Sequence, residues 1–388
     1  MAVKRYCESY IFQDVKKKMV FIGGPRQVGK TTLARALARE EFTRTAYFNW
    51  DVDEDRKAIR SKQWQRDTAL IIFDELHKYP RWKQWIKGVY DSKLEGQHYL
   101  VTGSARLDVY RRGGDSLMGR YHYWRLHPLS LDELPVGITP EDAYQRLLKN
   151  GGFPEPFLMN DEREARRWRK ERFDRVLRED VRDVSLIREI QLLYFFVDAL
   201  RNRVGSLITL SNLARDLEIS PKTAKSWLIL IEKMYIVFSV PPLTRNIPRA
   251  VQKPPKVYFF DNADTIDNAA VRLENLVATH LLKRLHFIED YYGHRCRLHY
   301  IRDKDNREVD FVTIIDDIVI DLIEVKLHDT KISASLKYYA KKLKPKHVVQ
   351  IVGDCPHPFD KDGISVMSPI DFFKNPPWEC PISSPLSS

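Results

Sequence analysis

The sequence has few cysteines and no long apolar segment. Its four cysteines are scattered along 388 residues without a CxxC pair, and this spacing indicates neither a disulfide framework nor a zinc site. No apolar stretch approaches the ~20 residues of a membrane helix, and the first residues contain no apolar core of the signal-peptide kind. We therefore expect a cytoplasmic protein with no membrane partner.

Acidic residues are fewer than basic residues. The chain has 64 Lys and Arg against 53 Asp and Glu, a formal net charge of +11 and a basic pI of about 9.3. A basic excess permits a polyanionic partner without proving one. The length suits two to four domains of roughly 100–200 residues. Residues 376–388 are rich in Pro and Ser, which predicts a disordered tail.

One stretch near the start carries a complete chemical motif. Residues 24–31, GPRQVGKT, match the pattern GxxxxGK[ST] between an apolar run that predicts a strand and a run that predicts a helix. Backbone N–H groups of such a loop can cradle phosphates, while Lys30 would reach the β- and γ-phosphates and Thr31 would bind Mg²⁺. The predicted ATP-binding residues are Gly24, Pro25, Arg26, Gln27, Val28, Gly29, Lys30, Thr31 and Thr32.

A second motif supplies the acidic partner that such a loop needs. The apolar run 69–73 predicts a central parallel strand and ends in Asp74 and Glu75. Asp74 would hold the Mg²⁺ ion through water, and Glu75 would position or deprotonate the attacking water. The alternative is an acidic pair that caps the next helix. The letters DELH also resemble a helicase box, but a single nucleotide-binding core makes that interpretation weaker.

These motifs, with "LVTGSA", "GRYHYWRLHPLSLDEL" and "GGFPEPF", resemble a bacterial and archaeal group of AAA+ ATPases that carry a C-terminal domain of unknown function (AAA-14/DUF4143 type). The resemblance covers roughly residues 5–350 and implies an ATP hydrolase that forms a homo-oligomer. By the same resemblance, Ser104 would sense the γ-phosphate and Arg120 would be an arginine finger for a neighbouring subunit. A turn residue and a surface arginine are the alternatives, and other arginines compete as the finger: Arg106, Arg111 and Arg112.

The middle of the chain predicts a helical region over 131–205 and a winged helix-turn-helix over 206–258. Ser220 and Pro221 suit the N-cap and the first position of its second helix. One interpretation is DNA binding; the other is a lid or an oligomer contact. The DNA-binding residues would be Lys222, Thr223 and Lys225 on the helix and Arg245 and Arg249 on the wing.

From residue 259 the pattern is a helix containing Glu274, three strands and a lysine-rich helix. The order Glu274, Asp310, then Glu324-x-Lys326 resembles the PD-(D/E)XK nuclease fold, although Val309 replaces the proline. That resemblance implies that Asp310 and Glu324 bind Mg²⁺ with Glu274 as an outer ligand, and that Lys326 activates water. The alternatives are a structural ion pair and a domain that binds without cleaving. The DNA-binding residues of the following helix would be Lys337, Lys341 and Lys342.

The predicted architecture is an α/β chain. It comprises a P-loop AAA+ core (1–130), a helical lid (131–205), a winged helix (206–258) and a restriction-endonuclease-like domain (259–375). The predicted function is a Mg²⁺-dependent ATPase that acts on DNA, with a C-terminal domain that binds DNA and could cleave it. The alternatives are an ATP-controlled regulatory switch or scaffold and, third, a helicase or branch-migration motor.

Overall fold

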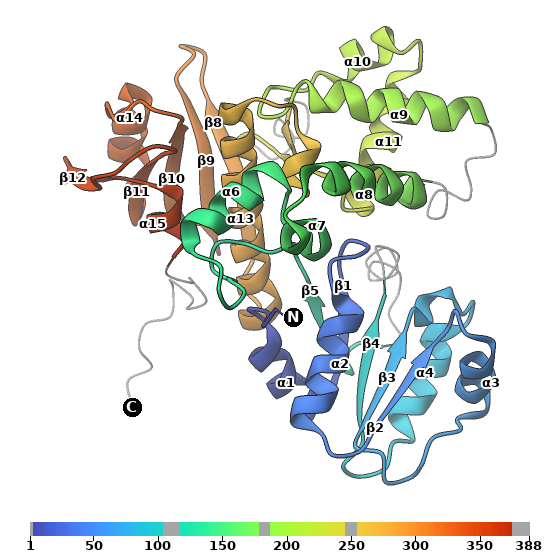
Figure 1. Ribbon diagram of the computed structural model, residues 1–388. Helices are drawn as coiled ribbons and strands as arrows, with labels where there is room; N and C mark the ends of the chain where they lie inside the picture. The colour runs from blue at the N-terminus through green and yellow to red at the C-terminus, as the bar shows by residue number, and fades with distance from the viewer. Residues whose placement is uncertain (1–2, 104–116, 178–186, 245–253, 375–388) are drawn as a thin grey trace. The chain divides into compact units, whose positions relative to one another are not determined.

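The computed structural model describes residues 3–103, 117–177, 187–244 and 254–374. The chain divides into two compact units, Met1–His127 and Pro128–Ser388, and each is considered by itself (Figure 1). Three predicted site residues lie outside the described residues: Ser104, Arg245 and Arg249. The predicted tail at 376–388 and the competing arginines Arg106, Arg111 and Arg112 lie outside them too.

The first unit is built around a five-stranded parallel sheet. Its elements are α1 (Glu8–Lys17), β1 (Met19–Gly23), α2 (Lys30–Glu41), β2 (Thr45–Asn49), α3 (Asp53–Ser61), β3 (Leu70–Asp74), the 3₁₀ turn η1 (Leu76–Lys78), α4 (Trp82–Asp91), β4 (His98–Thr102) and β5 (Tyr121–Arg125). The strand order is β2-β3-β4-β1-β5. Strand β4 therefore lies between the two strands that carry the nucleotide motifs.

Burial on both faces explains why the central strands read as continuous apolar runs. Every residue of β1 and β3 is buried. Phe21 and Phe73 join the core that includes Trp82 and Ile86 of α4, while α1 and α2 pack against the same strands. The predicted parallel α/β core is confirmed.

The second unit begins with helices. They are α6 (Pro140–Lys149), α7 (Pro154–Met159), α8 (Glu162–Arg175), α9 (Ile187–Arg201), α10 (Leu210–Asp216) and α11 (Pro221–Lys233). The helical region therefore starts at Pro140 and not at residue 131, because the preceding segment is bonded to another helix, as described below. Ser220 caps α11 as expected, since its hydroxyl accepts the N–H of Thr223 at 3.0 Å. Strands β6 (Val237–Val240) and β7 (Lys256–Phe259) pair antiparallel where the wing was predicted.

A six-stranded mixed sheet completes the second unit, in the order β12-β13-β11-β10-β9-β8. Its elements are α13 (Ala269–Tyr292), β8 (Cys296–Arg302), β9 (Glu308–Ile315), β10 (Ile318–Lys326), α14 (Ala334–Leu343), β11 (His347–Val352), β12 (Phe359–Lys361), β13 (Ile364–Met367) and α15 (Pro369–Phe373). The predicted helix, three strands and lysine-rich helix are thus present in order, and Asp316 and Asp317 form the β9–β10 turn with positive φ angles.

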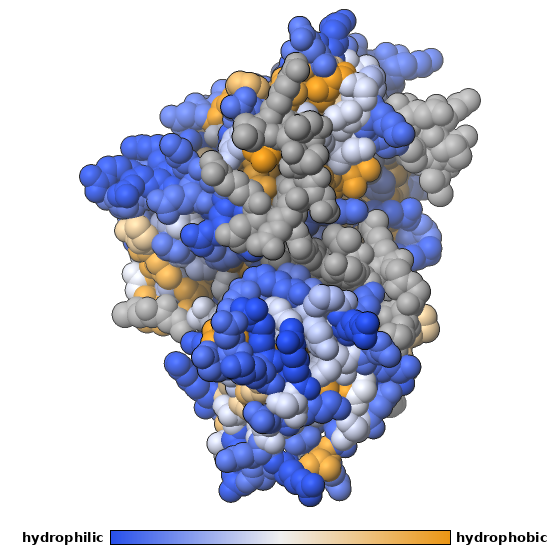
Figure 2. Space-filling model, turned by 90° about the vertical axis from the view of Figure 1, so that its right-hand side faces the viewer, coloured by the Kyte–Doolittle hydropathy of each residue, from blue (hydrophilic) through white to orange (hydrophobic). Residues whose placement is uncertain are grey.

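The surface is mainly polar on the side drawn in Figure 2, where hydrophobic areas are small and separate. None of the helices in the described ranges has the length and apolar content that a bilayer span requires.

Candidate functional site

The loop between β1 and α2 has a backbone that only glycine can adopt at two positions. Gly24 has a φ of +133°, and a Cβ there would lie 2.4 Å from the carbonyl oxygen of Leu126. Gly29 has a φ of +98° and occupies the N-cap of α2 without a capping side chain. The first N–H groups of α2 are therefore not covered by a cap, and a helix N-terminus with uncapped N–H groups suits a phosphate.

Lys30 is held inside this loop. Lys30 is 7% exposed, and its Nζ donates to the carbonyl oxygens of Gly24 at 3.1 Å and Pro25 at 2.7 Å. Those two bonds fix the ammonium against the loop that the motif assigns to the phosphates. Lys30 thus lies at the loop to which the motif assigns the phosphates, and its contact with a nucleotide stays a prediction.

Asp74 lies at the centre of three hydroxyl groups. Thr31 Oγ1 and Tyr47 Oη each donate to Asp74 Oδ2 at 2.7 Å, and the Thr102 hydroxyl donates to Oδ1. The Thr31–Asp74 bond joins the two residues predicted to hold Mg²⁺, and a hydroxyl and a carboxylate oxygen are ligands that suit this ion. The residues present therefore fit a magnesium site.

Tyr47 and Thr102 were not predicted from the sequence. Both occupy neighbouring strands, since β2 and β4 flank β3 and Thr102 pairs in register with Asp74. Burial, followed by the hydrogen bond and the charge of Asp74, raises the pKa of Tyr47 above its ordinary value, so the phenol stays a donor. A polar residue at the last position of the apolar strand β4 was the one available signal for Thr102.

Glu75 follows Asp74 in an unusual backbone conformation, with a φ of +54°. Its Oε2 is buried without a hydrogen-bond partner, although the Lys78 ammonium lies 3.3 Å away. Burial raises the pKa of Glu75, and the charges of Lys78 and Lys30 act in the opposite direction. A buried carboxylate at the end of this strand can orient or deprotonate a water molecule, and here the carboxylate lies beside the Lys78 ammonium.

Arg120 lies at the other end of the sheet from the loop. Its carbonyl accepts the N–H of Met19, the first residue of β1, whereas the loop follows the last residue of that strand. The Arg120 side chain pairs with Asp91, Nε to Oδ1 at 2.7 Å. Arg120 therefore does not serve the nucleotide site of its own chain, and its role as a finger for a neighbouring subunit stays a prediction.

The second unit brings together the four residues that suggested a nuclease fold. The pairing of Ile323 with Phe311 continues to Glu324 opposite Asp310, and the charges of Asp310 and Glu274 both act on Lys326. Glu324 and Lys326 also contact each other, Oε1 to Nζ at 2.7 Å.

A residue that the sequence reasoning missed lies among these carboxylates. The Lys256 Nζ is 2.7 Å from Glu308 Oε1, 3.3 Å from Asp310 Oδ1 and 3.4 Å from Glu274 Oε1. The hydroxyl of Tyr258 donates to Glu274 at 2.7 Å. Both residues come from β7, the predicted wing strand, and no local pattern ties that strand to Asp310.

Lys256, Glu274, Glu308, Asp310, Glu324 and Lys326 together form what we call the second centre. Their charges shift one another's pKa values. Burial, and then the charge of Asp310, raises the pKa of Glu274 to about 7, and the same causes raise the pKa of Glu324 to about 7. Burial acts to lower the pKa of Lys256, but the charges of Asp310, Glu274 and Glu308 outweigh it and raise that pKa. Lys256 is therefore a firmly protonated ammonium.

The carboxylates do not fit a divalent metal in this arrangement. Within the described ranges, no group of three or more His, Cys, Asp or Glu side chains is arranged to hold a metal ion. Asp310 Oδ1 contacts Lys256 and its Oδ2 accepts the N–H of Val325 at 2.9 Å, while Glu324 Oε1 contacts Lys326. Most of the oxygens that a metal would need are thus engaged.

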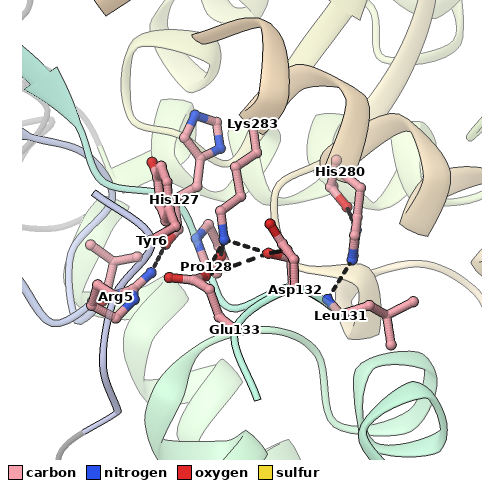
Figure 3. Close-up of polar contacts among 12 residues, drawn as sticks. Arg5, Tyr6, His127, Pro128, Leu131, Asp132, Glu133, His280 and Lys283 are labelled. Atoms are coloured by element: carbon pink, nitrogen blue, oxygen red, sulfur yellow. Dashed lines mark hydrogen bonds and ion pairs between the residues drawn. The ribbon is translucent and has the colours of Figure 1, made fainter. Parts of the chain in front are cut away.

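The motif "HPLSLDEL" has a structural use in the second unit (Figure 3). Lys283 of α13 is buried, forms an ion pair with Glu133 and donates to the carbonyl oxygen of Pro128 at 3.1 Å. The His280 Nε2 accepts the N–H of Leu131 at 3.0 Å, and burial lowers the pKa of His280 to about 3, which keeps the ring neutral. These contacts hold the segment before α6 against α13.

The described residues predicted to bind DNA lie in two places. Lys222 and Lys225 of α11 are exposed, and Thr223 is half-buried. On α14, Lys341 and Lys342 are exposed. Lys337 of the same helix pairs with Asp362 at 3.1 Å.

Family comparisons divide the chain into three parts. Residues 16–135 match an AAA domain. Residues 141–271 match a domain of unknown function, DUF8612, and residues 272–371 match another, DUF4143.

Curated relatives are distant. The uncharacterized protein Rv2008c of Mycobacterium tuberculosis is 26% identical over 243 residues, which are 63% of this chain and 54% of that protein, and the Mycobacterium bovis protein Mb2031c gives the same values. The chain thus spans about half the length of these mycobacterial relatives. The uncharacterized protein MJ1544 of Methanocaldococcus jannaschii is 23% identical over 363 residues, 85% of this chain and 80% of that protein.

Solved structures are similar at a low level. The Thermotoga maritima RuvB Holliday junction branch migration motor has 16% identity and a TM-score of 0.31, covering 63% of this chain and 92% of its own. Bacteroides Pif1 bound to ssDNA has 14% identity and a TM-score of 0.22, covering 39% and 46%. Likeness of this degree carries no argument about activity. The family matches show an AAA domain at residues 16–135 and a C-terminal DUF4143 domain at residues 272–371.

Proposed function

We propose that the first unit binds ATP with Mg²⁺ and hydrolyses it, in a cytoplasmic protein that acts on DNA. The observation that carries the ATPase proposal is the bond between Thr31 and Asp74 at 2.7 Å, beside a Lys30 ammonium held in the loop. This contact joins the start of α2 to the end of β3, so the groups needed for phosphate and for magnesium occur in one place.

Each of these residues has a distinct task in the proposed reaction. The N–H groups at the start of α2 and the Lys30 ammonium would bind the phosphates, which places positive charge where negative charge accumulates. Thr31 and Asp74 would hold Mg²⁺, which when bound neutralises charge on the phosphate oxygens. Glu75 would accept a proton from the attacking water, or orient that water, through its buried carboxylate, which the Lys78 ammonium contacts at 3.3 Å.

An ATPase assay with matched variants tests this proposal. We expect Lys30→Ala to lose ATP binding or turnover, because the charge beside the phosphates is gone, and Glu75→Gln to bind ATP without hydrolysing it. The controls are Lys57→Ala and Glu54→Gln, which change exposed residues of α3 in the same unit. Hydrolysis at the wild-type rate by Glu75→Gln would refute the assignment of Glu75.

DNA is the proposed partner because lysines are exposed on two helices, with Lys222 and Lys225 on α11 and Lys341 and Lys342 on α14. Neutralising phosphates releases counterions, so binding should weaken as salt rises. We expect Lys341→Ala/Lys342→Ala to bind duplex or single-stranded DNA more weakly in fluorescence anisotropy. Each lost phosphate contact should reduce the slope of log K against log salt by about 0.7–0.9.

The matched control for DNA binding is Lys57→Ala/Lys93→Ala, which removes the same charge from exposed positions of the first unit. An equal loss of affinity in this control would mean that net charge alone governs binding and would refute the assignment to α14. The same measurement on Lys222→Ala/Lys225→Ala decides the role of α11.

A regulatory switch or scaffold is the second candidate, and the position of Lys256 favours it over a nuclease. In that case ATP would set a conformation, and the C-terminal domain would bind a partner without cutting it. Stimulation of ATP turnover by DNA supports the first function, whereas tight retention of nucleotide with negligible turnover supports the switch. DNA cleavage, like a helicase or branch-migration activity, stays a prediction.

The proposed homo-oligomer can be tested through Arg120, the predicted arginine finger. A finger that acts on a neighbouring subunit requires Arg120 to exchange its contact with Asp91 for one with a nucleotide. Mixing Arg120→Ala subunits with Lys30→Ala subunits should then restore part of the activity at mixed interfaces. A protein that hydrolyses ATP at full rate as a monomer would refute this role.

A further inference from the structure

The second centre contains a buried cation that belongs to the chain. The side chain of Lys256 is 3% exposed, and its ammonium contacts the carboxylates of Glu274, Glu308 and Asp310 within 3.4 Å. Glu274 comes from α13, and Glu308 and Asp310 come from β9. Charged groups at this depth require partners. Lys256 contacts all three carboxylates, and Glu308 also pairs with Arg302 at 3.4 Å.

The oxygens around Lys256 are those that the nuclease resemblance assigns to a metal. Magnesium requires carboxylate oxygens at about 2.0–2.1 Å and near-octahedral geometry. Here the Asp310 and Glu274 oxygens lie 3.3 and 3.4 Å from an ammonium nitrogen instead. An ion bound to these same oxygens would lie close to the Lys256 ammonium, and repulsion between the two cations opposes its binding while Lys256 is charged.

Two further features describe the surroundings of these carboxylates. The Gly205 residue has a φ of +72°, and a Cβ there would lie 2.8 Å from Glu274 Oε1, so the carboxylate is closed off on that side. The side chain of Glu324 is 7% exposed, and its Oε2 has no hydrogen-bond partner. This centre therefore retains an unsatisfied buried acceptor while its cation position is taken.

We propose that Lys256 is the resident cation of this centre and takes the place of the divalent metal that the nuclease resemblance implies. The C-terminal domain then binds no divalent metal at Asp310 as long as Lys256 is present. Removal of the Lys256 charge uncovers a site for Mn²⁺ or Mg²⁺ on the same carboxylates. The inference does not depend on the proposed ATPase, which resides in the first unit.

The test measures Mn²⁺ binding by electron paramagnetic resonance, with full-length protein in the absence of nucleotide. Five proteins are compared: wild type, Asp310→Asn, Lys256→Met, Lys256→Met/Asp310→Asn and Lys283→Met. Methionine has nearly the length of lysine without its charge. Lys283→Met is the matched control, because it also removes a buried ammonium, but one that pairs with Glu133 and not with Glu274, Glu308 or Asp310.

We expect Lys256→Met to bind one Mn²⁺ ion more than the wild type and to be stabilised by Mn²⁺ in thermal unfolding. Adding Asp310→Asn should abolish both effects, and Lys283→Met should show neither. Wild-type binding that falls on Asp310→Asn substitution would overturn the proposal, as would a folded Lys256→Met protein that binds no additional ion.

Lys256→Met could fail to fold because Glu274 and Asp310 lose the ammonium that contacts them. Rescue of its folding by Mn²⁺ would support the proposal. Without rescue, Lys256→Met/Glu308→Gln replaces it, since one of the negative charges that Lys256 contacts is removed as well, and absence of Mn²⁺ binding in that variant refutes the proposal. ATP turnover in the same samples reports on the ATPase separately, and its loss would not bear on Lys256.

Discussion

Tyr47 offers a sharp test of the nucleotide site, because its hydroxyl is one of three that donate to Asp74. The Tyr47 Oη lies 2.7 Å from Asp74 Oδ2, and the hydroxyls of Thr31 and Thr102 are the other two donors. Tyr47→Phe deletes this hydroxyl alone. The ring keeps its place under the Arg35 guanidinium, whose Cζ lies 4.1 Å from the ring centroid.

The size of the effect follows from the charge of the acceptor. A hydrogen bond to an ionised group contributes about 1.5–3 kcal/mol, and Asp74 is 4% exposed, so water replaces the lost donor poorly. We expect the free energy of unfolding of the first unit to fall by about 1.5–3 kcal/mol. If the bond also orients Asp74 toward Thr31, ATP turnover should fall by roughly tenfold, since about 1.4 kcal/mol is a factor of ten.

Chemical denaturation and steady-state ATP turnover measure the two effects. Tyr99→Phe is the matched control, because Tyr99 is a buried tyrosine of the same sheet whose hydroxyl donates to Gln97 at 3.1 Å and not to Asp74. We expect this control to lose stability without a specific loss of turnover. Equal turnover in Tyr47→Phe and wild type would refute the idea that the Tyr47 hydroxyl positions Asp74.

Three further predictions concern other charges. Lys283→Met should destabilise the second unit by about 3–5 kcal/mol in urea denaturation, whereas Lys283→Met/Glu133→Leu should cost less because the Glu133 carboxylate is no longer left without its partner; equal costs would contradict this. Glu274 and Glu324 have folded-state pKa values of about 7, above the ordinary value. The stability that they contribute is therefore complete below about pH 4.5 and is lost as the pH rises through 7, by on the order of 1–3 kcal/mol. Glu274→Gln should flatten the dependence of unfolding free energy on pH between pH 5 and 8, and an unchanged slope would rule out this contribution of Glu274. Arg120→Ala should bind ATP normally but lose turnover by roughly 10³-fold if the finger acts in an oligomer, and an unaltered rate would exclude that role.

The sequence was a good guide wherever neighbours along the chain make the site. The loop residues from Gly24 to Lys30 are adjacent, so their glycines, lysine and helix start were predictable together. Ser220 caps α11 through Thr223, three residues away. Glu324 and Lys326 share a face of β10 by strand alternation alone, and they do contact each other.

Contacts between segments that are distant in the sequence could be identified only from the tertiary structure. Thr102 and Tyr47 reach Asp74 because β4 and β2 flank β3, and apolar periodicity does not encode the order of strands in a parallel sheet. Lys256 precedes Asp310 by 54 residues and looked like a basic residue of a wing.

The sequence by itself therefore determined the chemistry of the nucleotide loop, because that chemistry is local to one turn of chain and to the strand end at Asp74. Only the tertiary structure decided what the carboxylates of the second unit face. Carboxylates that gather in space need a cation, and whether a metal or a lysine supplies it depends on which distant strand packs beside them. Here β7 brings Lys256, and the ammonium stands between Glu274, Glu308 and Asp310.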